Sequence, residues 1–220
     1  MERTAVVSQS IDQFPIAAQW GERLLGVKAV FFDMDGTLFN TEPMHARALW
    51  SLIEDKGMSA LSWEKGIIER PEDFEVFRGM SDDLVFSYLS SSLGSDSGDL
   101  IDKKNKWFEA NGDALHDYFP QELKDFLLEL KSRGLKLALV SASQREVIDL
   151  FLKVLGLTDL FDVTIGASDV KQAKPSPEPY ERAMQACGVM PSEVIIFEDS
   201  IPGLTSALAS GARAYKAAWF

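Results

Sequence analysis

Cysteine and histidine are scarce in this chain of 220 residues, which has one of the former and two of the latter. The single cysteine, Cys187, excludes an intrachain disulfide and any zinc cluster built on cysteines. The two histidines, His45 and His116, are too few for a metal site made of several histidines. With no disulfide to form, our default expectation is a reducing, cytoplasmic setting.

Long apolar runs are also missing. No stretch reaches the roughly 18 consecutive apolar residues that a membrane span requires. The first 26 residues lack the basic start and apolar centre of a secretory signal. We interpret residues 1–26 as an N-terminal extension, with an uptake peptide as the alternative. Four of its apolar residues have the spacing of a short helix: Ile16, Ala17, Trp20 and Leu24.

Positive charge is in deficit, since 22 Lys and Arg face 34 Asp and Glu, for a net charge of −12. Such a chain repels phosphate backbones and anionic lipids, so we expect neither nucleic acid nor a membrane as partner. A small phosphorylated substrate stays open, because a bound cation can invert the local field. The sequence has no G-x-G-x-x-G and no G-x-S-x-G motif. Residues 21–28 match the sequence pattern of a phosphate-binding loop only in part.

Strands and helices alternate along most of the chain. Short apolar runs with strand character occur at residues 28–33, 135–140, 161–165, 194–197 and 213–215. Helical spacing of apolar residues occurs at 43–56, 121–133, 144–155, 177–187 and 203–210. This alternation predicts an α/β fold with a doubly wound (Rossmann-like) parallel sheet.

Residues 43–119 interrupt that alternation with a stretch that has only helical patterns. Ser81 and Asp99 are placed where side chains cap the starts of two of its helices. We therefore expect an inserted α-helical cap domain at 43–119. The α/β core domain is then formed by residues 27–42 and 120–220.

Chemically active side chains come directly after four of the expected strands. In open α/β sheets, ligands bind beyond the carboxyl ends of the strands, so these groups should meet at one edge of the sheet. They are Asp33 and Asp35 after the first strand, Ser141, Ala142 and Ser143 after the second, Asp169 and Lys174 in the loop after the third, and Glu198 and Asp199 after the fourth.

This set of groups suits phosphate chemistry. Carboxylates that crowd together cannot all stay ionised without a counter-charge, which Mg²⁺ supplies while binding oxygen ligands. Ser141, Lys174 and backbone N–H groups could bind the phosphoryl oxygens, and a carboxylate could attack phosphorus to give an aspartyl-phosphate. A calcium loop is a poor alternative for Asp33 and Asp35, because Gly36 comes too early for the glycine of such a loop.

Four motifs in order resemble those of the haloacid dehalogenase-like hydrolase superfamily. They are Phe31-Phe-Asp-Met-Asp-Gly-Thr-Leu-Phe-Asn-Thr-Glu42, Val140-Ser-Ala-Ser143, Lys174-Pro-Ser-Pro-Glu-Pro-Tyr180 and Phe197-Glu-Asp-Ser-Ile-Pro-Gly203. The inserted helical stretch is similar in position to the mobile cap of the subgroup that holds phosphoglycolate phosphatase-like and β-phosphoglucomutase-like enzymes. The resemblance covers nearly the whole chain apart from the N-terminal extension.

The resemblance implies a role for each core residue. Asp33 would be the nucleophile, and Asp35 the acid and base that serves first the leaving group and then the attacking water. Mg²⁺ would be held by Asp33, the Asp35 backbone carbonyl and Asp199, with Glu198 beside or behind it. The carbon–halogen hydrolases of the superfamily lack the second carboxylate, so Asp35 favours phosphate chemistry. The transferring phosphoryl group would be bound by Ser141, Ala142 and Lys174.

Three cap residues resemble substrate positions of the same relatives, namely His45, Arg78 and Lys104. The alternative for each is an ordinary helix or loop side chain in contact with solvent. Asp82 stands where the mutases of this subgroup have an arginine after the serine. This reversal of charge favours hydrolysis over mutase chemistry.

Three functions compete on this basis. The first is a Mg²⁺-dependent phosphatase that hydrolyses a small phosphorylated metabolite, such as a sugar phosphate, through an aspartyl-phosphate. The second is a β-phosphoglucomutase-like phosphomutase, and the third is a non-catalytic regulatory or binding relative. We favour the first and expect a monomer or weak dimer.

Overall fold

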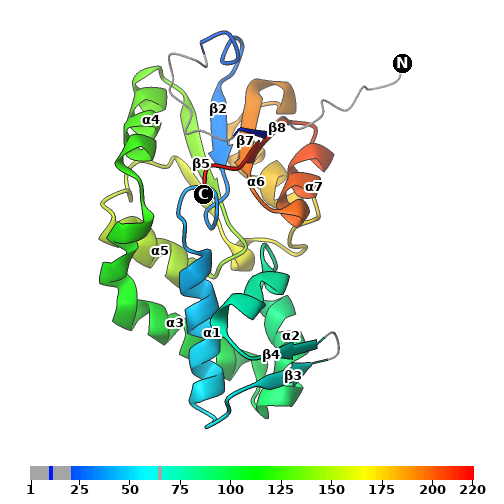
Figure 1. Cartoon of the computed structure of the whole chain (residues 1–220). Coiled ribbons are helices and arrows are strands. Elements are labelled where there is room, and N and C mark those ends of the chain that lie inside the picture. Colours follow the sequence, from blue (N-terminus) through cyan, green and yellow to red (C-terminus); the bar gives the residue numbers. More distant parts are fainter. Residues whose placement is uncertain (1–9, 12–20, 64–65) are drawn as a thin grey trace.

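A parallel sheet of six strands forms the centre of the larger lobe (Figure 1). The computed structural model describes residues 10–11, 21–63 and 66–220. Neighbouring strands follow the order β1-β8-β7-β2-β5-β6, so β2 lies between β5 and β7 in the middle of the sheet. The strands are β1 (Ser10–Ile11), β2 (Ala29–Phe32), β5 (Lys136–Val140), β6 (Val163–Ile165), β7 (Val194–Glu198) and β8 (Arg213–Ala217).

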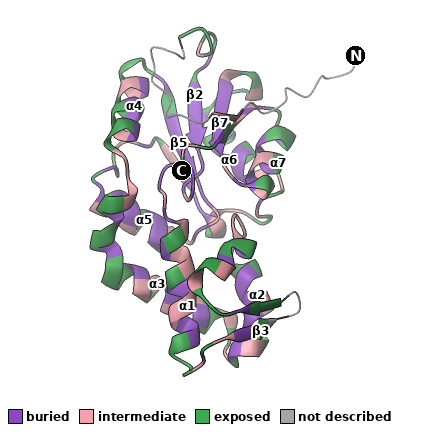
Figure 2. Ribbon diagram, in the orientation of Figure 1, coloured by how far each residue is buried: buried purple, intermediate pink, exposed green. Residues whose placement is uncertain are grey.

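Helices cover both faces of this sheet (Figure 1). They are α4 (Gln121–Ser132) and α5 (Arg145–Val154) on one face, and α6 (Glu178–Cys187) and α7 (Ile201–Ala209) on the other. Successive strand residues point to opposite faces, so Phe32 packs with α4 and α5 whereas Phe31 packs with α6. Burial on both faces explains why the central strands are almost continuously apolar (Figure 2). The predicted doubly wound α/β core is confirmed.

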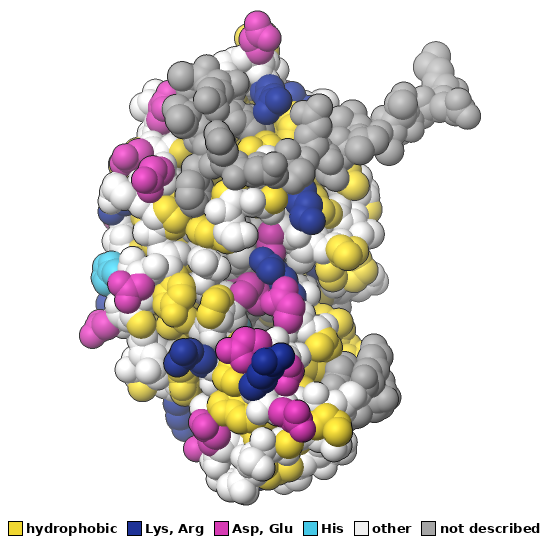
Figure 3. All heavy atoms as spheres, viewed as in Figure 1, with side chains coloured by type: hydrophobic (Ala, Val, Ile, Leu, Met, Phe, Trp, Pro, Cys, Tyr) yellow, Lys and Arg dark blue, Asp and Glu magenta, His cyan; other side chains and the backbone are white. Residues whose placement is uncertain are grey.

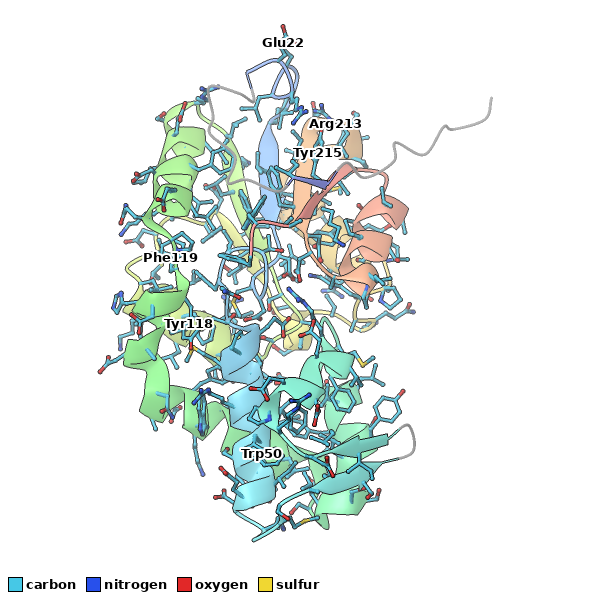
Figure 4. The ribbon with its side chains drawn as sticks, in the orientation of Figure 1. Glu22, Trp50, Tyr118, Phe119, Arg213 and Tyr215 are labelled. Carbon is cyan, nitrogen blue, oxygen red and sulfur yellow. The ribbon has the colours of Figure 1, made fainter. Side chains whose placement is uncertain are left out.

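The second lobe is inserted between β2 and α4 and has an apolar core of its own. Its elements are α1 (Glu42–Glu54), β3 (Leu61–Trp63), β4 (Gly66–Ile68), a 3₁₀ helix (Pro71–Phe77), α2 (Asp82–Leu93), α3 (Ser97–Asn111) and a second 3₁₀ helix (Gly112–Tyr118). The chain crosses between the lobes twice, and the crossings touch. Asn40 N donates to the carbonyl of Tyr118 at 2.9 Å, and the rings of Phe39 and Phe119 pack 5.4 Å apart (Figure 4).

The expectation of an all-helical cap is wrong at residues 61–68. There β3 and β4 form an antiparallel hairpin, in which Leu61 pairs with Ile68 and Ser62 with Ile67. Leu61 and Ile68 are buried in the cap core, whereas Ile67 is 60% exposed. Each strand has only three residues, which is too short for an alternation that the sequence can distinguish from a turn of helix.

The helix starts in the cap also differ from those expected. Asp96, not Asp99, caps α3, because its side chain accepts a hydrogen bond from Gly98 N at 2.8 Å. Asp99 lies in the first turn of that helix. Ser81 does occupy the N-cap position of α2, but its side chain makes no capping hydrogen bond.

The N-terminal extension contributes a strand that was not expected. Ser10–Ile11 forms β1, which pairs with Lys216 and Ala217 of β8. Two residues give no periodic signal, so only the tertiary pairing reveals this strand. Of the expected short helix, Leu24 packs against the core, and its three other residues lie outside the described residues. In the part of the chain that the structure describes, no helix has the length and apolar character to span a membrane.

The hairpin register predicts opposite results for two neighbouring substitutions. Ile68→Ala opens a cavity in the cap core and should lower the free energy of unfolding by about 2–5 kcal/mol. Ile67→Ala removes an exposed side chain and should change it by no more than about 0.5 kcal/mol. Urea unfolding followed by circular dichroism measures both. A larger loss for Ile67→Ala would mean that the strands pair in a register shifted by one residue.

Candidate active site

The ammonium group of Lys174 lies at the carboxyl edge of the sheet, among groups from three strands. It donates to Asp33 Oδ1 at 2.5 Å, to Glu198 Oε1 at 2.7 Å and to the carbonyl of Val140 at 2.9 Å. Asp33 directly follows β2, Val140 ends β5, and Glu198 ends β7. An ammonium group has three donors, and each has a partner here. The structure therefore brings together residues up to 141 positions apart in the chain.

Negative charge exceeds positive charge around this ammonium. Burial raises the pKa of Asp33, the Glu198 charge raises it further, and Lys174 offsets part of the rise. Burial and Glu198 likewise raise the pKa of Asp199 to about 6, although Arg78 opposes this. Burial alone would lower the pKa of Lys174, but the charges of Asp33 and Glu198 raise it above its ordinary value. One more cation would stabilise the ionised carboxylates.

The acidic residues supply an oxygen donor set that fits such a cation. One carboxylate oxygen from each of Asp33, Glu198 and Asp199 lies within 4.8 Å of the other two. Oxygen ligands without histidine or cysteine are those of a hard cation such as Mg²⁺. The resemblance assigns Asp35 to the metal through its backbone carbonyl, and its side chain contacts other partners.

Glu198 is the most deeply placed of the expected metal ligands. It is fully buried, and its Oε1 accepts hydrogen bonds from Lys174 and from the Tyr180 hydroxyl at 3.1 Å. Its Oε2 accepts from the backbone N–H and the hydroxyl of Ser200. A Cβ on Gly203 would lie 1.7 Å from Glu198 Oε1, so only glycine fits there. Glu198 is therefore a buried partner that fixes the position of the Lys174 ammonium.

Asp35 is held by three donors from different segments. Its Oδ1 accepts from Thr41 at 2.5 Å and from His45 Nε2 at 2.9 Å, and its Oδ2 accepts from Ser143 at 3.0 Å. Burial by itself would raise the pKa of Asp35, but the charge of His45 and these hydrogen bonds lower it to about 2. Among the expected cap residues, His45 is thus the one that contacts Asp35.

The glycine after Asp35 leaves space for Asp199, which belongs to the fourth motif. Gly36 has φ +83°, which favours glycine, and a Cβ there would lie 2.4 Å from Asp199 Oδ2. Asp199 can therefore lie directly against the turn that follows Asp33 and Asp35. The Thr37 hydroxyl fixes it there by donating to Asp199 Oδ1 at 3.0 Å.

The expected phosphate-binding residues lie at the same edge. Ser141 is buried, and its hydroxyl oxygen accepts from Ser143 N at 3.0 Å. Ala142 and Lys174 line a cavity of about 480 Å³ that also contacts Asp33 and Asp35. Asp169, the remaining acid after a strand end, is not part of this group. Its carboxylate accepts from Gly166 N and pairs with Arg145.

Arg78 reaches the core from the cap. Its Nε and Nη2 lie 3.0 and 2.9 Å from Asp199 Oδ2, and its Nη1 donates to Glu75 at 3.0 Å. A Cβ on Gly79 would lie 2.6 Å from Ser200 Cβ, so this cap loop sits directly on the core. Acidic and basic side chains gather between the two lobes on this face (Figure 3). The third expected cap residue, Lys104, instead forms a buried ion pair with Asp82.

Sequence reasoning gave no role to several residues that complete the site. Thr41, Ser143 and Tyr180 each donate to a predicted site carboxylate, and Glu42 lines the cavity. All four lie within the four motifs, which is the signal that could have singled them out. Their partners, however, depend on the tertiary fold.

The comparisons with known proteins identify the family. Residues 30–217 match the haloacid dehalogenase-like hydrolase family. The chain is 31% identical over 199 residues to protein CbbY of Rhodobacter capsulatus, covering 85% of this chain and 83% of that protein. It is 27% identical over 193 residues to pyrophosphatase PpaX of Bacillus cereus (strain AH820), covering 88% and 84%. The chain belongs to the haloacid dehalogenase-like hydrolases.

One relative is much longer than this chain. SUPPRESSOR OF QUENCHING 1, a chloroplastic protein of Arabidopsis thaliana, is 30% identical over 200 residues, which are 88% of this chain and 18% of that protein. Among solved structures, CbbY from Rhodobacter sphaeroides with phosphate has a TM-score of 0.70 at 24% identity, covering 86% of this chain and 84% of that one. This likeness confirms the fold. Together with the family, the relatives confirm the expected enzyme class, a phosphatase of the haloacid dehalogenase-like hydrolases.

Glu42 gives a test of the site's electrostatics. Burial raises the pKa of Glu42 to about 8, and the charges of Asp35, Asp199 and Glu75 add to the rise while Arg78 opposes it. The folded state therefore holds a proton that the unfolded state releases near pH 4.5, so the stability present below pH 4.5 is lost as the pH rises to 8.

Glu42→Gln should remove this loss. The unfolding free energy of the variant minus that of the parent should increase by roughly 1.4 kcal/mol per pH unit in the middle of this interval. Urea unfolding with EDTA from pH 4.5 to 8 measures the difference. Glu54→Gln, which removes an exposed acid at the other end of α1, is the control. A difference that stays constant with pH would contradict the prediction.

Proposed function

We propose that this phosphatase is Mg²⁺-dependent and hydrolyses small phosphorylated metabolites through an aspartyl-phosphate on Asp33. The observation that carries the proposal is Lys174, bonded to Asp33 and Glu198 with Asp199 within 4.8 Å of both acids. Such a group of opposite charges can bind a phosphate dianion and a divalent cation side by side. Two relatives are named for phosphorylated compounds, one a pyrophosphatase and one a validoxylamine A 7'-phosphate phosphatase of Streptomyces hygroscopicus subsp. limoneus.

The reaction divides into two displacements at phosphorus. In the first, a carboxylate oxygen of Asp33 bonds to phosphorus, and the ester oxygen leaves with a proton from Asp35 as the free alcohol. In the second, water gives a proton to Asp35 and its oxygen bonds to phosphorus, which releases phosphate and restores Asp33. Ser141 and the backbone at Ala142 bind the phosphoryl oxygens, and Lys174 does so in exchange for one of its present acceptors. Mg²⁺, when bound by Asp33 and Asp199, would neutralise the charge that accumulates on these oxygens.

The hydrogen bonds to Asp35 favour its ionised form. A pKa of about 2 keeps the carboxylate ionised but makes it a weak base, so its pKa must rise during the reaction. As the acid of the first step it must first gain a proton. The negative charge of a phosphate bound next to it would favour that, because like charges raise the pKa of a carboxyl group.

The cap supports hydrolysis over the phosphomutase alternative. A bisphosphate intermediate needs cations for two phosphates, and Asp82 already neutralises Lys104. The complete set of Asp33, Asp35, Lys174 and Asp199 in one place speaks against a non-catalytic relative.

Asp33→Asn tests the nucleophile. With Mg²⁺ and p-nitrophenyl phosphate, kcat should fall by roughly 10³-fold or more, because an amide cannot form the phospho-enzyme. Rapid acid quenching with a radiolabelled phosphate ester should trap label on the parent protein and none on the variant. Asp159→Asn, which changes an exposed acid outside the site, should match the parent. Parental turnover by Asp33→Asn would refute the assignment.

Asp199→Asn tests the cation. EDTA should abolish turnover of the parent, and Mg²⁺ should restore it. In the variant, the Mg²⁺ concentration for half-maximal activity should rise by at least about tenfold, since even outer partners of bound metals contribute that much. Isothermal titration of Mg²⁺ into each protein gives the affinity without turnover. Equal Mg²⁺ affinities for parent and variant would remove Asp199 from the metal set.

A further inference from the structure

The cap side of the cavity carries a buried ion pair. Asp82 is the first residue of α2, and Lys104 lies on α3. The Lys104 ammonium donates to Asp82 Oδ1, and only 3% of the Lys104 side chain and 6% of the Asp82 side chain are exposed. Both residues line the same cavity as Asp33 and Asp35. A substrate whose phosphate lies at Asp33 would extend toward this pair.

One oxygen of the pair has no partner. Asp82 Oδ2 is buried and accepts no hydrogen bond from any described residue. Buried polar atoms in native proteins almost always have a partner, and leaving an ionised oxygen without one is costly. Asp82 lines the cavity, and its Oδ2 can only accept a hydrogen bond, so a ligand that enters the cavity can supply the missing donor.

The cap half of the cavity offers no spare buried cation among its described residues. Its acids are Glu42, Glu72, Glu75 and Asp82, and its bases are His45, Arg47, Arg78 and Lys104. His45 is bonded to Asp35. Arg78 is bonded to Asp199 and Glu75, and Lys104 is bonded to Asp82, whereas Arg47 is exposed to solvent. A second anionic group on a substrate would have to lose its water without gaining a buried counter-charge, which is unfavourable.

Resting on the proposed phosphatase function, we propose that Asp82 and Lys104 form a specificity subsite for the leaving group. The subsite accepts phosphate monoesters whose distal end carries neutral hydroxyl groups, because Asp82 Oδ2 accepts a hydrogen bond from one of them. It rejects monoesters with a second phosphate or a carboxylate at that end. Lys104 holds the Asp82 carboxylate in place and limits the negative charge that a neutral substrate meets.

A matched pair of substrates measures this selection. Sorbitol 6-phosphate and gluconate 6-phosphate share an open six-carbon chain and differ at the distal carbon, which carries a hydroxyl in one and a carboxylate in the other. The readout is the ratio of their kcat/KM values with the full chain and Mg²⁺. Because it is a ratio, a general loss of activity in a variant cancels. For the parent we expect the hydroxyl compound to be favoured by about tenfold or more, the worth of one charge-assisted hydrogen bond.

Two substitutions should move this ratio in opposite directions. Asp82→Asn leaves the Lys104 charge uncompensated and should lower the preference for the hydroxyl compound by about tenfold. Lys104→Met leaves the Asp82 charge uncompensated and should raise the preference. Asp83→Asn and Lys106→Met, which make the same charge changes at exposed neighbouring positions, should leave the ratio at the parental value. Thermal unfolding of every variant establishes that it is folded.

The outcomes separate this inference from the proposed function. A parent that prefers gluconate 6-phosphate would overturn the subsite, as would an Asp82→Asn ratio equal to that of Asp83→Asn. If neither compound nor p-nitrophenyl phosphate is hydrolysed, the proposed function fails. The subsite is then judged by the ratio of the two dissociation constants, measured by calorimetry on the parent and on Asp82→Asn, with the same expected directions.

Discussion

The interaction on which the site depends is the buried ammonium of Lys174 between Asp33 and Glu198. All its donors are used, and its partners end or directly follow three different strands, so the ammonium fixes the carboxyl ends of β2, β5 and β7 relative to one another. The central place of β2 in the sheet is what allows this arrangement. An isolated buried charge of either sign is costly in free energy. Removing one partner would leave such a charge in the site, so the members of this group depend on one another.

Much of this site could be predicted from the sequence, because each core motif is a short local pattern and the topology of the sheet brings the motifs together. Asp33 and Glu198 come at or next to the ends of apolar strands, and a parallel doubly wound sheet places such ends at one edge. The strands that the sequence could not predict are those whose local patterns are weak. Neither the two residues of β1 nor the three-residue strands of the hairpin at 61–68 have a period to detect.

Single charges on the cap were the least predictable part of the site. In the sequence, Lys104 and Arg78 have the same patterns as solvent-exposed side chains of helices and loops. The fold gives them different partners, since Lys104 meets Asp82 of a neighbouring helix whereas Arg78 crosses to Asp199 in the other lobe. Pairings over such separations follow from how helices pack. A motif that lists residue types therefore identifies candidates without identifying what they bind.

The donors to Asp35 show how the position of the cap and the chemistry of the core are linked. Ser143 belongs to the core, whereas His45 lies on α1 of the cap, and Thr41 directly precedes that helix. Any rotation of the cap about the crossings near residues 40 and 118 moves His45 relative to Ser143. Such a rotation would loosen contacts that keep the carboxylate ionised. The donors that hold the Asp35 carboxylate thus come from both lobes, so the contact between the lobes and the ionisation of Asp35 depend on each other.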